Sequence, residues 1–338
     1  MRIGFNPNKD KKIEISEYFH QVIIPVYIPN EDGYFKDSFQ ILKYCLESLF
    51  KTSHTNTYFT VVNNGSCKEV VNYLNALHGN GRIHEIIHTA AIGKLNAILK
   101  GLTGQNFQLV TITDADVLFL NNWQKETYKI FDNFPKAGVV STTPNSKLIR
   151  YLTSNIIFER GVSNQLKFTM VINPEAMKAF ASSIENKCLF NNYHLEKYLT
   201  IANGKVKAVI GAGHFVATYR NDIFNNFKEK TSKYSLGGES ERVLLDKPVI
   251  DNGYWRLSTE DNYTYHMGNI EEEWMSGILK SLKYKLFSLK QPKFSKHSSL
   301  KFINYFKSKI FPKIVFNKLV WHFFLRSKGL TKDEAKNY

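Results

Sequence analysis

Residues 107–116 read FQLVTITDAD, an apolar run that ends in two aspartates separated by one small residue. A short apolar run bounded by polar residues is typical of a strand buried inside a sheet. Because alternate residues of an extended chain point to the same side, Asp114 and Asp116 are expected side by side. Two adjacent carboxylates repel each other unless a cation lies near them. The stretch therefore predicts a buried strand with a divalent-cation site at its end, or, alternatively, a turn with two solvated aspartates.

Three similar apolar segments precede this one and alternate with helical patterns. Strands are expected at 21–28 (QVIIPVYI), 58–62 (YFTVV), 83–88 and 107–113, and helices at 37–50, 69–77 and 93–102. This alternation predicts an α/β fold with a mostly parallel central sheet flanked by helices. Ligands of such sheets bind beyond the carboxyl ends of the strands. The polar residues that end the strands, Asn63, Asn64, Ser66, Asp114 and Asp116, are therefore expected in one site.

The composition supports a folded chain without disulfides. Of its 338 residues, 43% are hydrophobic, which is enough apolar material for a core and excludes general disorder. The three cysteines are odd in number and form no CxxC pattern, which indicates a reduced, cytosolic setting. Neither a signal peptide nor an uncharged apolar stretch of about 18 residues is recognised. The motifs GxGxxG and GxxxxGK[ST] are absent, which disfavours dinucleotide dehydrogenases and P-loop kinases.

The net charge of +15 is concentrated near the C-terminus. Residues 274–332 contain 14 Lys/Arg and no Asp or Glu, so residues 1–273 are nearly neutral. Aromatic residues alternate with these lysines at roughly helical spacing, and Pro312 is expected to break or restart the helix. A basic helix with an aromatic face can lie in the headgroup layer of an anionic membrane. We therefore predict a basic amphipathic helical tail at 274–338 that contacts a membrane; packing on the body and nucleic-acid binding are the alternatives.

Four segments stand in an order that resembles family-2 glycosyltransferases with the GT-A fold: IIPVY (23–27), VVNNGS (61–66), GKLNAI (93–98) and TITDADVLF (111–119). The resemblance covers residues 20–145 well and extends less specifically to His266. It implies a GT-A domain at 1–273, with a nucleotide-sugar half at 20–145 and an acceptor half at 146–273. The implied reaction is metal-dependent, inverting transfer of a sugar from a nucleotide-sugar to a hydroxyl of a glycan or lipid-linked glycan, by direct displacement.

The resemblance also implies a setting. Such an enzyme would serve polysaccharide biosynthesis in the cytoplasm, as a peripheral protein on the inner face of the cell membrane, and would bind no nucleic acid. UDP is the expected donor nucleotide, with GDP and dTDP as alternatives.

The family pattern implies roles for individual residues. Contacts to the nucleotide-sugar are implied for Pro25, Val26, Tyr27, Asn63, Asn64, Lys94, Asn96, Asp114, Ala115, Asp116, Gly213 and His214. Asp116 and His266 would hold Mn²⁺ or Mg²⁺, although a buried structural imidazole is the alternative for His266. Asn63 and Asn64 stand where the family usually has an aspartate at the base, which leaves the choice of base open.

The catalytic base is implied to come from the acidic segment 237–241, GGESE. The family usually has Glu-Asp there, whereas this chain has Ser240 at the second position. Glu241 and Glu239 are both candidates, with Glu241 slightly favoured, and Asp246 and Asp251 remain further possibilities.

Two other functions were open to the sequence. A sugar-phosphate nucleotidyltransferase usually carries a basic, glycine-rich loop after the first strand, where this chain has the acidic PNEDG (29–33). A nucleic-acid-binding protein would use the basic tail and bind with steep salt dependence, but it would leave the motifs of the body unexplained.

Overall fold

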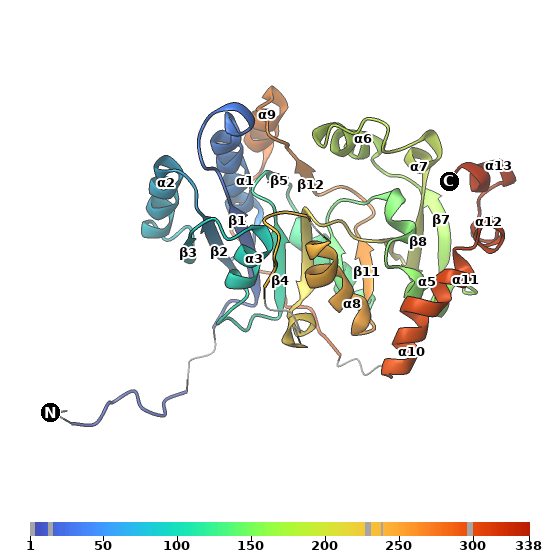
Figure 1. Cartoon of the computed structure of the whole chain (residues 1–338), viewed down its shortest axis with the longest axis horizontal. Coiled ribbons are helices and arrows are strands. Elements are labelled where there is room, and N and C mark those ends of the chain that lie inside the picture. Colours follow the sequence, from blue (N-terminus) through green and yellow to red (C-terminus); the bar gives the residue numbers. More distant parts are fainter. Residues whose placement is uncertain (1–3, 13–15, 227–230, 238, 296–299) are drawn as a thin grey trace.

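The computed structural model of the chain describes residues 4–12, 16–226, 231–237, 239–295 and 300–338. Gly238 of the acidic segment, residues 1–3 and 13–15 near the N-terminus and residues 296–299 of the tail lie outside this set. Within the described residues, ten strands form one sheet in the order β3-β2-β1-β4-β10-β6-β11-β9-β8-β7. The sheet runs across the whole body with helices packed along it (Figure 1).

The first half of the chain alternates strand and helix as the sequence predicts. It contains β1 (His20–Val26), α1 (Ser38–Thr52), β2 (Thr57–Asn64), α2 (Lys68–Gly79), β3 (Glu85–Thr89), α3 (Lys94–Gly101) and β4 (Leu109–Thr113). These four strands pair in parallel, in the order β3-β2-β1-β4. Val22 and Ile24 of β1 pack in one core cluster with α1, and Ile23 packs in another with α3. The apolar run of β1 is therefore buried on both faces.

The second half completes the sheet with mixed pairing. Its strands are β5 (Val117–Phe119), β6 (Ala137–Ser141), β7 (Leu166–Met170), β8 (Lys197–Asn203), β9 (Val206–Ile210), β10 (Val216–Arg220), β11 (Trp255–Ser258) and β12 (Thr264–His266). Strand β11 pairs in parallel with β6, whereas β10, β9 and β8 pair antiparallel with their neighbours. The predicted α/β class, a large and mostly parallel central sheet flanked by helices, is confirmed.

The helices of the second half cover the sheet and lead into the tail. They are α4 (Trp123–Asn133), α5 (Ser154–Arg160), α6 (Pro174–Ser183), α7 (Asn192–Glu196), α8 (Lys247–Asp251), α9 (Glu273–Ser281), α10 (Lys301–Tyr305), α11 (Phe311–Val315), α12 (Lys318–Ser327) and α13 (Lys332–Asn337). Strand β12 pairs antiparallel with β5 in a separate two-stranded sheet, which places His266 opposite Val117. This small sheet therefore brings a distant histidine beside the end of β4.

The described residues of the tail contact the body at several points. The backbone carbonyl of Phe287 accepts a hydrogen bond from Thr55, and the ring of Phe294 packs edge-on against Phe131. Trp321 and Leu325 of α12 are buried in the same core cluster as residues of β8, β9 and β11. In Figure 1, α10 to α13 lie against the β7 end of the sheet. Among the described residues, no helix is both long and apolar enough to cross a bilayer.

Candidate functional site

A cavity of about 440 Å³ opens at the carboxyl ends of β1, β2 and β4. Of the residues that the sequence singled out, it is lined by Pro25, Val26, Tyr27, Asn64, Lys94, Asp114, Ala115 and Asp116. Residues that sequence reasoning did not single out also line it, among them Tyr34, Phe35, Ser235, Leu236 and Asn269. The rings of Tyr27 and Tyr34 both pack against Phe35, and we call this part of the lining the aromatic end. The part formed by Lys94, Asp114 and Asp116 is called the charged end. Parallel strands that end together explain why segments almost 90 residues apart meet here.

Asp116 lies beside His266, as the sequence predicts for a pair of metal ligands. Its Oδ2 lies 3.4 Å from the Nε2 atom of His266, and no described residue hydrogen-bonds its buried Oδ1. Burial raises the pKa of Asp116, and the attraction of His266 acts in the opposite direction. A carboxylate with an unpaired buried oxygen is costly unless a cation compensates its charge. This oxygen and the neighbouring imidazole fit a divalent cation.

A hydrogen bond between the Nδ1 atom of His266 and the Ser183 hydroxyl orients the His266 ring. The Ser183 hydroxyl donates its hydrogen to the carbonyl oxygen of Phe180, at 2.8 Å, and can therefore only accept from the Nδ1 atom of His266, at 2.9 Å. When the ring is neutral, its proton therefore resides on Nδ1, which leaves Nε2, the nitrogen that faces Asp116, with a lone pair for a cation. Metal-ligating histidines are typically oriented in this way by a hydrogen bond at the other nitrogen.

Lys94 bridges two carboxylates at the charged end of the cavity. Its Nζ atom lies 2.6 Å from Asp114 Oδ1 and 3.0 Å from Glu241 Oε1. Burial lowers the pKa of Lys94, but the charges of Asp114 and Glu241 outweigh it and hold the pKa above its usual value. Lys94 therefore keeps its charge, and it connects the end of β4 with the acidic segment.

Asn96 does not line the cavity. Its side-chain amide exchanges two hydrogen bonds with the backbone of Ser232, at 2.7 and 2.9 Å, and the backbone N–H of Lys94 donates to the carbonyl of Ser235. These contacts hold residues 231–237, here called the strap, over the start of α3. A Cβ on Gly93 would lie 2.9 Å from the Cα of Ser235, so the strap approaches as closely as it can. Asn96 thus acts on the cavity through the strap.

The two asparagines that end β2 have different surroundings. Asn63 uses both ends of its amide inside the protein: Oδ1 accepts from the backbone N–H of Ser66, and Nδ2 lies 2.9 Å from Nδ1 of His88. Asn64 lines the cavity, and its Oδ1 accepts from the backbone N–H of Ile92 at 2.8 Å. Successive residues of a strand point to opposite sides, which explains the difference.

The remaining predicted residues lie around the cavity and do not line it. Glu239 has a positive φ of 59° and a side chain that is 70% exposed, and it pairs with Arg242. Glu241 pairs with Lys94, and its side chain is 28% exposed. Gly213 lies near Ser141, and the Nε2 atom of His214 lies 3.1 Å from Asp246 Oδ2. His214 is therefore paired with Asp246, outside the cavity.

Sequence reasoning gave little weight to a buried cluster within residues 146–273. Asp246 and Arg256 form an ion pair with both side chains fully buried. The Tyr151 hydroxyl donates to Asp246 at 2.9 Å, and Arg256 donates to the carbonyl of Ala212 at 2.7 Å. Arg256 occurs within the short apolar run YWRLS, and a charged residue inside a buried strand was the signal that could have revealed a partner.

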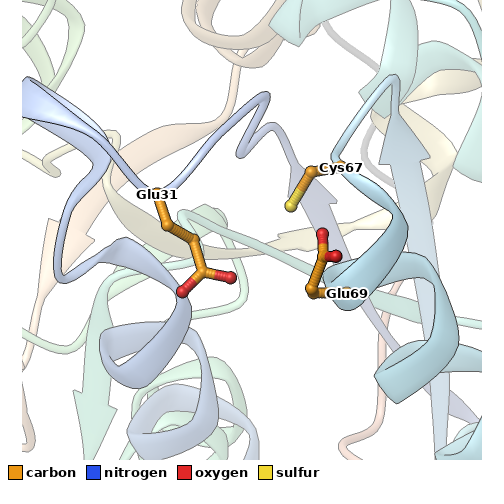
Figure 2. A group of neighbouring side chains, drawn as sticks. All are labelled: Glu31, Cys67 and Glu69. Atoms are coloured by element: carbon orange, nitrogen blue, oxygen red, sulfur yellow. The ribbon is translucent and has the colours of Figure 1, made fainter.

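A second group of possible metal ligands lies outside the cavity lining. Figure 2 shows Glu31, from the loop after β1, facing Cys67 and Glu69 at the start of α2, and one ligand atom from each lies within 4.8 Å of the others. Both glutamates are exposed, and exposed acidic groups gather in this way without a metal. The buried, unpaired oxygen of Asp116 distinguishes the Asp116–His266 pair from this group.

Comparison with solved structures finds matches at low sequence identity, with TM-scores below 0.5. TarS of S. aureus shares 13% identity over 77% of this chain, with a TM-score of 0.42, and the chain spans only 38% of its length. TarS 1–349 in complex with UDP-GlcNAc shares 13% identity over 94% of this chain and 69% of its own, with a TM-score of 0.45. The mannosyltransferase PcManGT from Pyrobaculum calidifontis, in complex with GDP-Man and Mn²⁺, shares 11% identity over 92% of this chain and 72% of its own, with a TM-score of 0.46.

Sequence comparison assigns the family. No curated protein sequence matches the chain. Residues 21–189 match the profile described as "Glycosyl transferase family 2", which spans β1 to the segment after α6 and includes Asn64, Lys94, Asp114 and Asp116. Because this match covers half of the 338 residues, the chain belongs to glycosyl transferase family 2.

Proposed function

We propose that the chain transfers a sugar from a nucleoside diphosphate donor to a hydroxyl group, with inversion and with a divalent cation. The observation that carries this proposal is the cavity at the strand ends, where Lys94, Asp114 and Asp116 converge. Tyr27 and Tyr34 offer aromatic faces to the base at the other end. The volume of the cavity, about 440 Å³, is in the range of sites that enclose small molecules.

Asp116 and His266 would hold the Mn²⁺ or Mg²⁺ ion. Bound there, the ion supplies positive charge to the departing diphosphate. Asp114, held by Lys94, is proposed to contact the donor beside it. The charged end of the cavity thus provides the groups that a diphosphate leaving group needs.

Glu241 is proposed as the base that accepts the proton of the attacking hydroxyl. The Nζ atom of Lys94 lies 3.0 Å from Glu241 and 2.6 Å from Asp114, so Lys94 holds the Glu241 carboxylate near the end of β4. Glu239 is the weaker candidate because its side chain is largely exposed and points to Arg242. Attack by the hydroxyl on the side opposite the diphosphate, in one displacement, inverts the anomeric carbon.

We also propose a division of roles along the chain. We propose that residues 20–145 bind the donor, residues 146–273 bind the acceptor, and residues 274–338 form the membrane-facing tail. Contacts to the donor by Gly213 and His214 remain part of this proposal, although both lie outside the cavity lining. The acceptor would be a glycan or a lipid-linked glycan, as in polysaccharide biosynthesis.

The tail has a second face that favours an anionic membrane. The exposed large hydrophobic side chains of its helical part, residues 300–323, are here called the tail face: Leu300, Phe302, Ile303, Tyr305, Ile310, Ile314, Leu319, Val320 and Phe323. Lysines 301, 309, 313 and 318 are exposed along the same helices. Apolar groups flanked by lysines suit the headgroup layer of a bilayer with anionic lipids. We propose that the tail face holds the enzyme at the inner surface of the cell membrane.

The catalytic proposal is tested by Asp116→Ala. We expect this variant to lose Mn²⁺-dependent hydrolysis of nucleotide-sugars, measured over a panel of UDP-, GDP-, dTDP- and CDP-sugars. Glu69→Ala, from the second ligand group, is the control and should retain the wild-type rate. Full activity of Asp116→Ala would reject the assigned site.

The membrane proposal is tested by Phe302→Ser/Phe323→Ser. We expect the double variant to lose co-sedimentation with vesicles that contain phosphatidylglycerol while keeping the wild-type unfolding midpoint, because both side chains are exposed. Phe5→Ser changes an exposed aromatic residue outside the tail and should bind vesicles as the wild type does. Unchanged binding by the double variant would refute the role of the tail face.

A further inference from the structure

Asn64 is a polar side chain that reaches the aromatic end of the cavity. Strands β1 and β2 pair with Val26 opposite Asn63, so Tyr27 and Asn64 are the next residues along the two strands. Both line the cavity, and Asn64 is only 4% exposed. A polar group this deeply placed beside a ligand contributes to selectivity, since a ligand that fails to pair with it leaves it unsatisfied.

The direction of the Asn64 amide follows from its neighbour. The backbone N–H of Ile92 donates to Asn64 at 2.8 Å, and a backbone N–H can only face an acceptor. The atom that faces Ile92 is therefore the amide oxygen and not the amide nitrogen. The NH₂ group consequently points away from Ile92. No described residue accepts a hydrogen bond from it, and it is not among the polar atoms sealed in the core, so it opens to the cavity.

We propose that Asn64 selects the base of the donor by donating a hydrogen bond from this NH₂ group to an acceptor atom of the base. The inference rests on the proposed function, because it takes the aromatic end as the base subsite. It makes Asn64 a specificity-determining residue, and the base it suits is one with an unprotonated ring nitrogen on its hydrogen-bonding edge, as in cytosine.

The hydrogen-bonding edges of cytosine and uracil predict which of the two bases Asn64 prefers. Uracil presents a ring N–H at the centre of its hydrogen-bonding edge, whereas cytosine, of the same size, presents a bare ring nitrogen there. The NH₂ group of Asn64 pairs with the bare nitrogen of cytosine. On uracil it can donate only to a carbonyl oxygen beside the ring N–H, which leaves that N–H without an acceptor. A carboxylate in this position would have the opposite preference, since it carries only acceptors. The proposal therefore departs from the UDP donor that the sequence resemblance implies.

The experiment compares CDP with UDP by titration calorimetry in the presence of MnCl₂. We expect the wild-type protein to bind CDP at least as tightly as UDP. Asn64→Asp keeps an acceptor for the Ile92 N–H and replaces the donor, so the affinity for UDP relative to CDP should rise at least about ten-fold. Asn63→Asp is the matched control, because Asn63 makes its contacts inside the protein, and its ratio should equal that of the wild type.

Two results would overturn the inference: a wild-type protein that binds UDP more than about ten-fold tighter than CDP, or an Asn64→Asp variant with an unchanged ratio. If Asn64→Asp does not fold, the wild-type ratio decides, and Asn64→Ser, which loses the amide, provides the second variant; its ratio should lose the preference for CDP. Binding of neither nucleotide in the presence of Mn²⁺ counts instead against the proposed function, and this inference falls with it.

Discussion

At the scale of single residues, Asp246 and Arg256 show what a buried ion pair demands. Burial raises the pKa of Asp246, but Arg256 and His214 outweigh this effect and hold the pKa below its usual range. The carboxylate is therefore ionised inside the protein, and its charge is compensated by Arg256 and the hydroxyl of Tyr151. Loss of one partner leaves the other charge buried and unpaired.

Arg256→Met is therefore expected to lower the free energy of unfolding by about 3–5 kcal/mol, measured by urea denaturation. The double variant Arg256→Met/Asp246→Leu should lose less than the single one, because it removes both charges. Lys129→Met, which breaks an exposed pair with Glu126, should stay within about 1 kcal/mol of the wild type. An Arg256→Met variant as stable as Lys129→Met would contradict this account.

Two histidines near the amino ends of β1 and β2, away from the cavity, make stability depend on pH. His20 and His54 both hydrogen-bond the hydroxyl of Tyr128, at 2.5 and 2.7 Å, and both are buried. Burial lowers the pKa of His54 to about 4 and also lowers the pKa of His20. Both rings are therefore neutral in the folded protein, whereas the unfolded chain takes up protons near pH 6.5.

The free energy of unfolding should consequently be highest above pH 6.5 and fall as the pH decreases, by about 1.4 kcal/mol per unit for each histidine. For His54 the loss should continue to about pH 4. Urea denaturation between pH 7.5 and 4.5 measures the slope. His54→Asn should reduce it, and His78→Asn, at the exposed end of α2, should leave it unchanged. An equal slope in both variants would show that His54 plays no part.

At the scale of elements, the strap and α3 depend on one glycine. Gly93 has a φ of +91°, which L-residues rarely adopt, and its Cβ would meet the backbone of Ser235. Gly93→Ala should therefore cost about 1–3 kcal/mol of stability and weaken nucleotide binding, because the strap must move and Ser235 and Leu236 line the cavity.

Gly104→Ala is the matched control for this prediction. Gly104 has a φ of +84° with nothing within 4 Å of its Cβ position, so it shares the backbone strain without the contact. It should lose about 1 kcal/mol and bind nucleotides as the wild type does. Equal nucleotide binding by both variants, measured by calorimetry, would exclude a role of the strap in shaping the cavity.

Helix α12 has one face buried against the body and one face exposed. Leu325 is fully buried against the body, whereas Leu319 is exposed. Leu325→Ala should lower the free energy of unfolding by about 2–5 kcal/mol because it leaves a cavity in the core. Leu319→Ala should change it by less than about 0.5 kcal/mol. Thermal and urea unfolding of the two variants would separate packing from surface exposure, and similar losses in both would contradict the orientation of the helix.

In two helical segments, a π-helical turn precedes a proline in the first turn of the next helix. A π-helical turn over Arg242–Asp246 precedes Pro248 in α8, and another over Phe306–Ile310 precedes Pro312 in α11. A proline lacks the N–H and crowds the carbonyl four residues before it, and a wider turn relieves that contact. Pro312 lies in the first turn of α11, so the expected restart of the helix occurs there.

At the scale of the whole molecule, the tail contributes to the core of the body. Trp321, Phe324, Leu325 and Leu330 are buried in a cluster with residues of β8, β9 and β11, and Lys307 and Lys136 share the carboxylate of Glu159. A chain ending at Lys290 should therefore unfold at a lower temperature and aggregate, because it exposes this cluster. Calorimetry of the shortened chain tests the expectation, which an unchanged midpoint would refute. Point variants on the tail face are for this reason the cleaner test of membrane binding.

The sequence by itself determined the strand–helix order of the first half, the placement of Asp114 and Asp116 at the end of β4, and the family. These features depend on the period of apolar residues and on contiguous motifs, which are local properties of the chain. It also indicated His266, through a motif remote from the aspartates, whose position the pairing of β12 with β5 explains.

Only the tertiary structure decided which of the neighbouring polar residues face the cavity. In the structure Asn64 lines the cavity, whereas Asn63 makes its contacts inside the protein. The side chain of Asn96 bonds to the strap, His214 pairs with Asp246, and the tail has one buried and one exposed face. Each of these outcomes depends on a partner far away in sequence, such as Ser232 for Asn96. The pattern of a single segment specifies which of its own residues share a side, whereas the partner that occupies that side is set by how the elements pack.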